Sequence, residues 1–175
     1  TLLKPLRQII LAARIPKTES LVPLADQIAS RMGTALHNGF ENAWVNGYEK
    51  AMQAMGFPQR VIDKVAINPT DEFLLANPDC LPFYMEQRLS KKIGKWTVTG
   101  KFDFIGEGTV QDVKSTGTYT YTKQTNDKKH PLQGSIYRWL DPKKITEDVM
   151  LIHYIFTDWA SMRAKQDPSY PQRRF

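Results

Sequence analysis

Residues 96–115 read WTVTGKFDFIGEGTVQDVKS, and this stretch decides the fold that we expect. Apolar and polar residues alternate over 96–105, a pattern typical of a β-strand. The tripeptide Gly106-Glu107-Gly108 then supplies a turn, and residues 109–115 form a second strand. Because the two strands are joined by such a short turn, the stretch predicts an antiparallel hairpin.

Segments on both sides of this hairpin extend the predicted sheet. Residues 83–93 predict a strand before it, and the nearly continuous apolar run over 149–156 predicts a buried strand after it. Residues 68–82 contain three prolines and several polar residues, so we expect a loop there. The polar, threonine-rich residues 117–129 predict a mobile loop.

Apolar residues at helical spacing predict helices around this sheet. The predicted helices cover residues 2–13, 24–55, 60–65, 131–140 and 159–164. Helices, then strands, then a helix and a last strand are typical of a mixed α/β (α+β) domain, with a central mixed sheet flanked by helices.

The 175 residues predict a single domain, since one domain per roughly 150 residues is usual. Within residues 1–175 we expect a helical N-terminal region over 1–57, a sheet core over 83–157 and a tail over 165–175.

Composition narrows the classes of function. The chain has 24 Lys and Arg against 18 Asp and Glu, a net charge of +6, which favours nucleic acid or anionic membrane surfaces as partners. No apolar run approaches the roughly 20 residues of a membrane span, which excludes an integral membrane protein. The single cysteine, Cys80, excludes an internal disulfide and a cysteine-rich metal site, and favours a reducing intracellular compartment.

The predicted hairpin carries a set of groups suited to metal chemistry. Asp112 and Lys114 are two residues apart and share one face of their strand, and Asp103 lies on the partner strand. Two carboxylates suit a hard cation such as Mg²⁺ or Mn²⁺, and a neighbouring lysine can position water or stabilise negative charge. The alternative is a set of salt bridges on a solvated sheet face, which are common and contribute little.

Three further features share this ambiguity. His37 and Glu41 lie four apart on one helix face, and a histidine can ligate Mn²⁺ or be a partly buried structural residue. Glu86 lies on the strand before the hairpin, either in the same cleft or exposed. Gln133 and Tyr137 lie four apart on a later helix, near the site or on ordinary helix surface.

The order of these features resembles a known family. The stretches GTALHNGFE, YMEQRL, GKFDFI, VQDVKSTG and QGSIYRWL carry a glycine and histidine, a glutamate, Gly-x-x-Asp, Asp-x-Lys and Gln-x-x-x-Tyr in turn. Over residues 33–140 this resembles the RecB-like branch of the PD-(D/E)XK nuclease superfamily, of the phage or mobile-element exonuclease type. The resemblance implies a restriction-endonuclease-like core.

Roles for individual residues follow from the resemblance by position. It implies metal ligation by His37, Asp103, Asp112 and the Val113 carbonyl. It implies catalytic roles for Asp103, Asp112, Lys114 and Glu86. The DNA-binding residues that we expect are Gln133, Tyr137, Tyr119, Tyr121, Ser115 and Arg138. Tyrosines such as Tyr119 and Tyr121 stack on bases at roughly 1–3 kcal/mol each, although tyrosine is also an ordinary strand residue.

The resemblance implies a metal-dependent DNA nuclease that hydrolyses phosphodiester bonds with one or two Mg²⁺ or Mn²⁺ ions. We expect an exonuclease that acts on DNA ends or single strands in recombination, repair or replication, with a recombinase, helicase or single-strand-binding protein as partner. Some relatives hold a four-cysteine iron–sulfur cluster, but Cys80 stands alone here, so we expect no such cluster. No GxxxxGK[ST] stretch is present, so we expect no nucleotide cofactor.

Two other hypotheses stay open beside the nuclease. One is a catalytically inactive nuclease-fold module that binds DNA, although the ligand-type residues and Lys114 are all present. The other is a basic α/β interaction domain in which the motif arises by chance. We expect an intracellular protein without a membrane partner, in the cytoplasm or nucleoid, in the host cytoplasm if phage-encoded, or in an organelle; the oligomeric state is left open.

Overall fold

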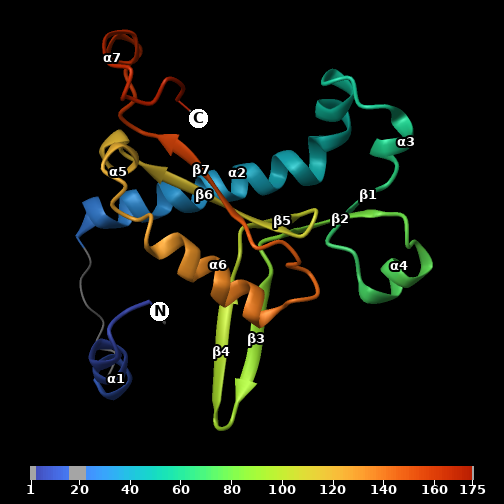
Figure 1. The fold of residues 1–175 in the computed structure, drawn as a ribbon, viewed down its shortest axis with the longest axis horizontal. Coiled ribbons are helices and arrows are strands. Elements are labelled where there is room, and N and C mark those ends of the chain that lie inside the picture. Colours follow the sequence, from blue (N-terminus) through green and yellow to red (C-terminus); the bar gives the residue numbers. More distant parts are fainter. Residues whose placement is uncertain (1–2, 16–22, 175) are drawn as a thin grey trace.

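The computed structural model describes residues 3–15 and 23–174 and shows a mixed α/β fold around a five-stranded sheet (Figure 1). The sheet has the order β1 (Val65–Ile67), β2 (Leu81–Met85), β5 (Phe104–Gly106), β6 (Thr109–Thr116) and β7 (Met150–Phe156). The outer pairs β1–β2 and β6–β7 are parallel, and the inner pairs β2–β5 and β5–β6 are antiparallel. The structure therefore confirms the predicted mixed α/β class, with a central mixed sheet flanked by helices.

Helices lie on both faces of the sheet. They are α1 (Leu6–Arg14), α2 (Leu24–Ala54), α3 (Gln59–Ile62), α4 (Asp71–Ala76), α5 (Thr118–Thr122), α6 (Lys129–Leu140) and α7 (Ser161–Gln166). The long helix α2 crosses behind the sheet in Figure 1, and α6 lies in front of it. The predicted helices over 24–55 and 131–140 are thus confirmed, with ends shifted by one or two residues.

Aromatic packing joins α2 to its face of the sheet. The Trp44 ring lies 5.1 Å from the rings of Phe83 and Phe104, and the Phe40 ring lies 5.8 Å from Phe104 in an edge-on arrangement. Offset and edge-on aromatic pairs at such distances add to the free energy of apolar burial. Because α2 also carries His37, this packing fixes where that histidine meets the sheet.

The main core lies on the other face, under α6. Its buried members are Tyr84, Leu89, Phe102, Ile105, Val110, Tyr137, Leu140 and Ile145. Phe104 packs toward α2 while its neighbour Ile105 packs toward α6, since consecutive strand residues point to opposite faces. Both faces of β5 are consequently buried.

The predicted hairpin turn is confirmed between β5 and β6. Gly106 pairs with Thr109, and the two residues between them both have positive φ, 50° at Glu107 and 75° at Gly108. Positive φ at both central positions is the type I′ turn, which matches the twist of a hairpin. The Gly108 carbonyl also accepts hydrogen bonds from the backbone N–H groups of Thr146 and Glu147, which fastens the turn to the segment before β7.

Two predicted strands are each divided in two, which corrects the sequence prediction. The segment 83–93 breaks at Glu86 and Gln87, and 96–105 breaks at Phe102 and Asp103. The outer halves, β3 (Arg88–Ile93) and β4 (Trp96–Lys101), pair with each other in a separate two-stranded sheet that we call the arm. The alternating pattern continues through Phe102 and Asp103, so the sequence shows no interruption there. At the other break the sequence changes from the apolar run 83–85 to the polar run 86–88.

Both predicted loops contain helices, and the sheet begins earlier than predicted. Helix α4 lies within 68–82, where Thr70 Oγ1 accepts a hydrogen bond from the Phe73 N–H as an N-cap. Helix α5 lies within 117–129. Strand β1 places the start of the sheet core at Val65 rather than at residue 83.

The C-terminal third differs from the prediction in two respects. Strand β7 is an edge strand with exposed Leu151 and His153, rather than a buried strand, because no further strand pairs with it among the described residues. The predicted tail over 165–175 packs on the domain, with Tyr170 and Pro171 buried. Residues 1, 2 and 16–22 of the helical region and residue 175 of the tail lie outside the described residues.

Within the described part of the chain, none of the helices combines the length and the apolar character that crossing a membrane requires.

The fastened turn predicts unequal effects of two glycine substitutions. A Cβ at Gly108 would lie 2.0 Å from Thr146 Oγ1, whereas a Cβ at Gly94, also at positive φ, would meet nothing within 4 Å. We expect Gly108→Ala to lower the free energy of unfolding by about 2–4 kcal/mol, and Gly94→Ala by about 1 kcal/mol. Urea unfolding of both variants measures the difference, and equal losses would contradict the contact with Thr146.

Candidate metal and catalytic site

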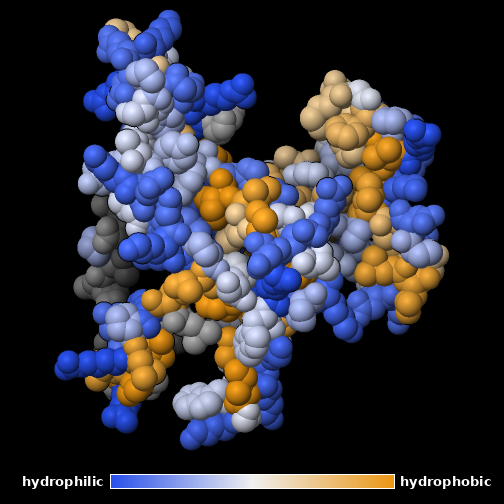
Figure 2. All heavy atoms as spheres, in the orientation of Figure 1, coloured by the Kyte–Doolittle hydropathy of each residue, from blue (hydrophilic) through white to orange (hydrophobic). Residues whose placement is uncertain are grey.

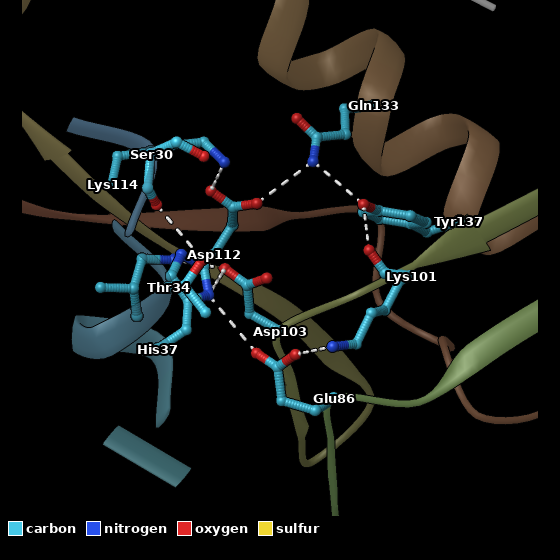
Figure 3. A network of polar contacts seen from close by, with 11 residues as sticks. Ser30, Thr34, His37, Glu86, Lys101, Asp103, Asp112, Lys114, Gln133 and Tyr137 are labelled. Carbon is cyan, nitrogen blue, oxygen red and sulfur yellow. Dashed lines mark hydrogen bonds and ion pairs between the residues drawn. The ribbon is translucent and has the colours of Figure 1, made fainter. Parts of the chain in front are cut away.

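The candidate site lies where the five-stranded sheet gives way to the arm, between α2 and α6 (Figure 3). Four separate segments supply its side chains: His37 from α2, Glu86 from the β2–β3 break, Asp103 from the β4–β5 break, and Asp112 with Lys114 from β6. The two strand breaks therefore deliver two of the three carboxylates.

A histidine and two carboxylates gather at the centre of the site. His37 Nδ1 lies 3.3 Å from Asp103 Oδ2 and 3.4 Å from Glu86 Oε1. One potential ligand atom from each of the three residues lies within 4.8 Å of the others. Carboxylate oxygens suit Mg²⁺ and Mn²⁺, and imidazole is compatible with Mn²⁺, so this donor set fits the predicted cations.

Asp112 and Lys114 form a second group beside this cluster. Asp112 is only 2% exposed, and its Oδ2 lies 2.5 Å from Lys114 Nζ. Its Oδ1 accepts a hydrogen bond of 3.1 Å from Gln133 Nε2. Asp112 and Lys114 thus share a strand face as predicted, but Asp112 is held by its own partners and is not among the atoms gathered around His37. Glu86 takes that place instead, so Asp112 as a ligand stays a prediction.

Asp103 links the two groups. Its Oδ2 accepts a hydrogen bond of 3.0 Å from the Val113 N–H, which ties Val113 to the site through its backbone. Burial raises the pKa of the Asp103 carboxyl above its ordinary value, and the charge of Asp112 raises it further. The Val113 N–H, His37 and Lys114 oppose that rise only in part. The site therefore holds a carboxylate whose charge is poorly compensated, which favours a bound cation.

Two residues that position Glu86 carry no signal in the sequence. Lys101 forms an ion pair with Glu86 Oε2. Asn68 Oδ1 accepts hydrogen bonds from the Met85 N–H at 2.8 Å and from Gln87 Nε2 at 2.9 Å. It is thus bonded to the residues on both sides of Glu86. Glu86 has a φ of 52°, a strained left-handed conformation for a residue other than glycine. Asn68 lies in a segment predicted as loop, and no motif marks its contact with residues 17 and 19 positions away.

The structure places Tyr137 in the hydrogen-bond network of the site. Its side chain is only 8% exposed, and its hydroxyl group donates a hydrogen bond of 2.6 Å to the Lys101 carbonyl. The same hydroxyl accepts a hydrogen bond of 3.1 Å from Gln133 Nε2, and burial raises the pKa of Tyr137. These hydrogen bonds show that Tyr137 orients Gln133, and through it Asp112, while its contact with nucleic acid stays a prediction.

The other expected DNA contacts are dispersed. Ser115 lines a cavity of about 310 Å³ that also includes Lys114 and Gln133. Tyr119 is exposed on α5, while the Tyr121 ring packs edge-on against those of Tyr154 and Phe156.

Arg138 lies apart from this group. It pairs with Asp148 at 2.6 Å and lines a second cavity of about 790 Å³. The structure thus brings Ser115 and Gln133 next to Lys114 but leaves Arg138 in a different pocket.

Comparisons with protein-family models, with curated proteins and with solved structures find no match to this chain. Its function is therefore inferred from the residues of the site.

The environment of Asp103 predicts a pH dependence of stability in EDTA. A carboxyl group whose folded-state pKa is raised lowers stability as pH rises from the ordinary value of 3.8 through the folded value. We expect Asp103→Asn to remove this loss, so the variant should gain stability over the wild type at pH 7 but gain less at about pH 4. Urea unfolding at both pH values measures the gain, and a gain independent of pH would contradict the raised pKa.

Proposed function

We propose that the chain is a divalent-metal-dependent deoxyribonuclease with a restriction-endonuclease-like core, acting on DNA ends or single strands. One observation carries the proposal: the His37–Glu86–Asp103 cluster lies beside the Asp112–Lys114 ion pair in a single site built from four segments. A metal-ligand cluster next to a lysine is an arrangement that can catalyse phosphodiester hydrolysis, since the metal activates water and both stabilise negative charge on the phosphate.

The charge of the site fits a cation. Three carboxylates, Glu86, Asp103 and Asp112, meet two lysines, Lys101 and Lys114. His37, Glu86 and Asp103 would hold the ion, with Asp112 close enough to raise the pKa of Asp103. A bound Mg²⁺ or Mn²⁺ supplies an acidified water and neutralises charge on the phosphate.

The protein's own residues then have distinct tasks. Lys114 places an ammonium group where the negative charge of the phosphate grows, and Asp112 holds that group by its ion pair. Gln133 fixes Asp112, and Tyr137 fixes Gln133. Asn68 holds the strained turn that presents Glu86. These three supporting residues keep the reacting groups in position. Their effect matters because misplacement by about 1 Å can lower a rate about a hundredfold.

The cavity beside Lys114 supports nucleic acid as the substrate. Its lining includes Lys114 and Lys129 and several neutral hydrogen-bonding residues, and contains no carboxylate. A phosphate is thus not repelled at its walls.

The proposal predicts cleavage that requires both the metal and Lys114. End-labelled linear and circular DNA should be degraded with Mn²⁺ or Mg²⁺ and not with EDTA. We expect Asp103→Asn and Lys114→Ala to lower the rate on the order of 10²–10³-fold, because each removes electrostatic stabilisation of the transition state. Lys143→Ala, which removes an exposed charge outside the site, is the matched control.

The cleavage pattern of the end-labelled and circular DNA distinguishes further possibilities. Resistance of circular DNA would identify an exonuclease. Cleavage that persists in both variants would come from a contaminant and contradict the proposal. DNA binding without cleavage in either metal would favour the inactive binding module.

Metal binding has a readout independent of activity. We expect Mn²⁺ at about 100 times its Kd to raise the free energy of unfolding of the wild type by about 2.7 kcal/mol. Because His37 and Asp103 belong to the ligand cluster, His37→Ala and Asp103→Asn should abolish this gain. An equal gain in all three proteins, measured by urea unfolding with and without Mn²⁺, would place the ion elsewhere.

A further inference from the structure

The arm carries an uneven distribution of charge. Residues 88–101 include five cations, Arg88, Lys91, Lys92, Lys95 and Lys101, and no Asp or Glu. Of these five cations, Lys101 alone pairs with a carboxylate of the described residues, and that carboxylate is Glu86. Figure 2 shows the arm projecting from the body of the molecule at the bottom of the view. A projecting element with excess positive charge points to a polyanionic partner.

The two faces of the arm differ in character. The cross-strand pairs Arg88–Lys101, Ser90–Thr99 and Lys92–Thr97 form one face, and all six residues are exposed. This polar face continues into the candidate site, because Lys101 pairs with Glu86. A polyanion lying along Lys92, Arg88 and Lys101 would therefore reach the metal-ligand cluster.

The opposite face is covered by α6 only near its base. There Leu89 is buried, and a Cβ at its partner Gly100 would touch Tyr137 and Leu140 of α6. Lys91 lies over the Trp139 ring, 4.6 Å from its centroid, and donates a hydrogen bond to the Trp139 carbonyl. Beyond this point the pair Ile93–Trp96 stands uncovered at the tip.

The tip pair is unusually apolar for such a position. Trp96 is 66% exposed and Ile93 is 50% exposed, and Lys95 Nζ lies 5.4 Å from the centre of the Trp96 ring. The alternating pattern of 96–105 puts Trp96 in line with Phe102 and Phe104, which are buried, so the sequence gives no sign of its exposure. An apolar pair surrounded by cations suits DNA, where apolar side chains contact thymine methyl groups in the major groove while lysines contact phosphates.

We propose that the arm is a duplex-DNA-binding element that holds the substrate beside the site, with Arg88 and Lys92 on phosphates and the Ile93–Trp96 tip against base pairs. Two six-residue strands are about 20 Å long, and a two-stranded ribbon fits the roughly 12 Å major groove. The inference rests on the proposed function only in naming DNA as the polyanion.

Binding measured in EDTA tests the arm without catalysis. A short blunt duplex and its separate single strands are titrated with wild type, Arg88→Ala/Lys92→Ala and Trp96→Ala over a range of salt. We expect the double variant to bind the duplex about tenfold or more weakly, and its salt slope to fall by about two, one for each phosphate contact. Trp96→Ala should weaken binding about fivefold or more and leave the slope unchanged.

Lys50→Ala/Lys64→Ala is the matched control, since it removes two exposed charges at the far end of α2 and after α3. Equal losses in the control and the arm variant would reduce the effect to net charge and overturn the proposal. So would wild-type affinity of the arm variants, or a loss confined to single strands.

The same proteins separate this inference from the proposed nuclease. With Mn²⁺, the arm variants should still cleave a single-stranded oligonucleotide too short to reach the arm. Asp103→Asn should show the reverse, with duplex binding kept in EDTA and cleavage lost. Absence of cleavage in every protein, together with arm-dependent duplex binding, would contradict the nuclease and leave the arm in place.

Discussion

The fold depends on two adjacent interruptions, one between β2 and β3 and the other between β4 and β5. The Glu86 N–H donates to the Asp103 carbonyl, and the Phe102 N–H donates to the Gln87 carbonyl, so the two breaks satisfy each other's backbone groups. Phe102, which is fully buried, anchors the interruption in the core. Without it, β2–β3 and β4–β5 would be two continuous strands. The two interruptions instead end the five-stranded sheet and begin the arm. They also bring the carboxylates of Glu86 and Asp103 close to each other.

The site, the core and the arm share residues, so they are mechanically linked. Tyr137 belongs to the core cluster, bonds the Lys101 carbonyl at the base of the arm and orients Gln133 toward Asp112. Lys101 likewise faces two ways, with its backbone bonded to α6 and its ammonium paired with Glu86. Helix α6 therefore sets the position of β4 and of the Asp112 carboxylate at once. Such shared supports keep charged groups at fixed distances, which electrostatic catalysis needs.

Much of this arrangement could be predicted from local patterns. Alternation and a Gly-x-Gly turn specify the β5–β6 hairpin, because side-chain period and turn geometry are local properties. The two-residue spacing likewise specifies the shared face of Asp112 and Lys114. The break at Asp103 could not be predicted, since the apolar alternation runs through Asp103 unchanged. The change from the apolar run 83–85 to the polar run 86–88 does not by itself mark the break at Glu86. The hydrogen bonds of Asn68 beside Glu86 and the exposure of Trp96 could not be predicted either. Both depend on which segments meet in three dimensions.

Strand β7 also raises a question of association between chains. An unpaired strand edge offers backbone donors and acceptors to any other extended chain, and proteins commonly block such edges. Here the Phe156 N–H donates to the Arg174 carbonyl, while Trp159 Nε1 bonds the Pro171 carbonyl and holds the returning segment in place. Residues 170–174 thus cover the C-terminal end of β7 and satisfy one of its backbone donors. Their removal would uncover the end of β7 and lengthen the strand edge that is open to intermolecular pairing, and with it a route to aggregation.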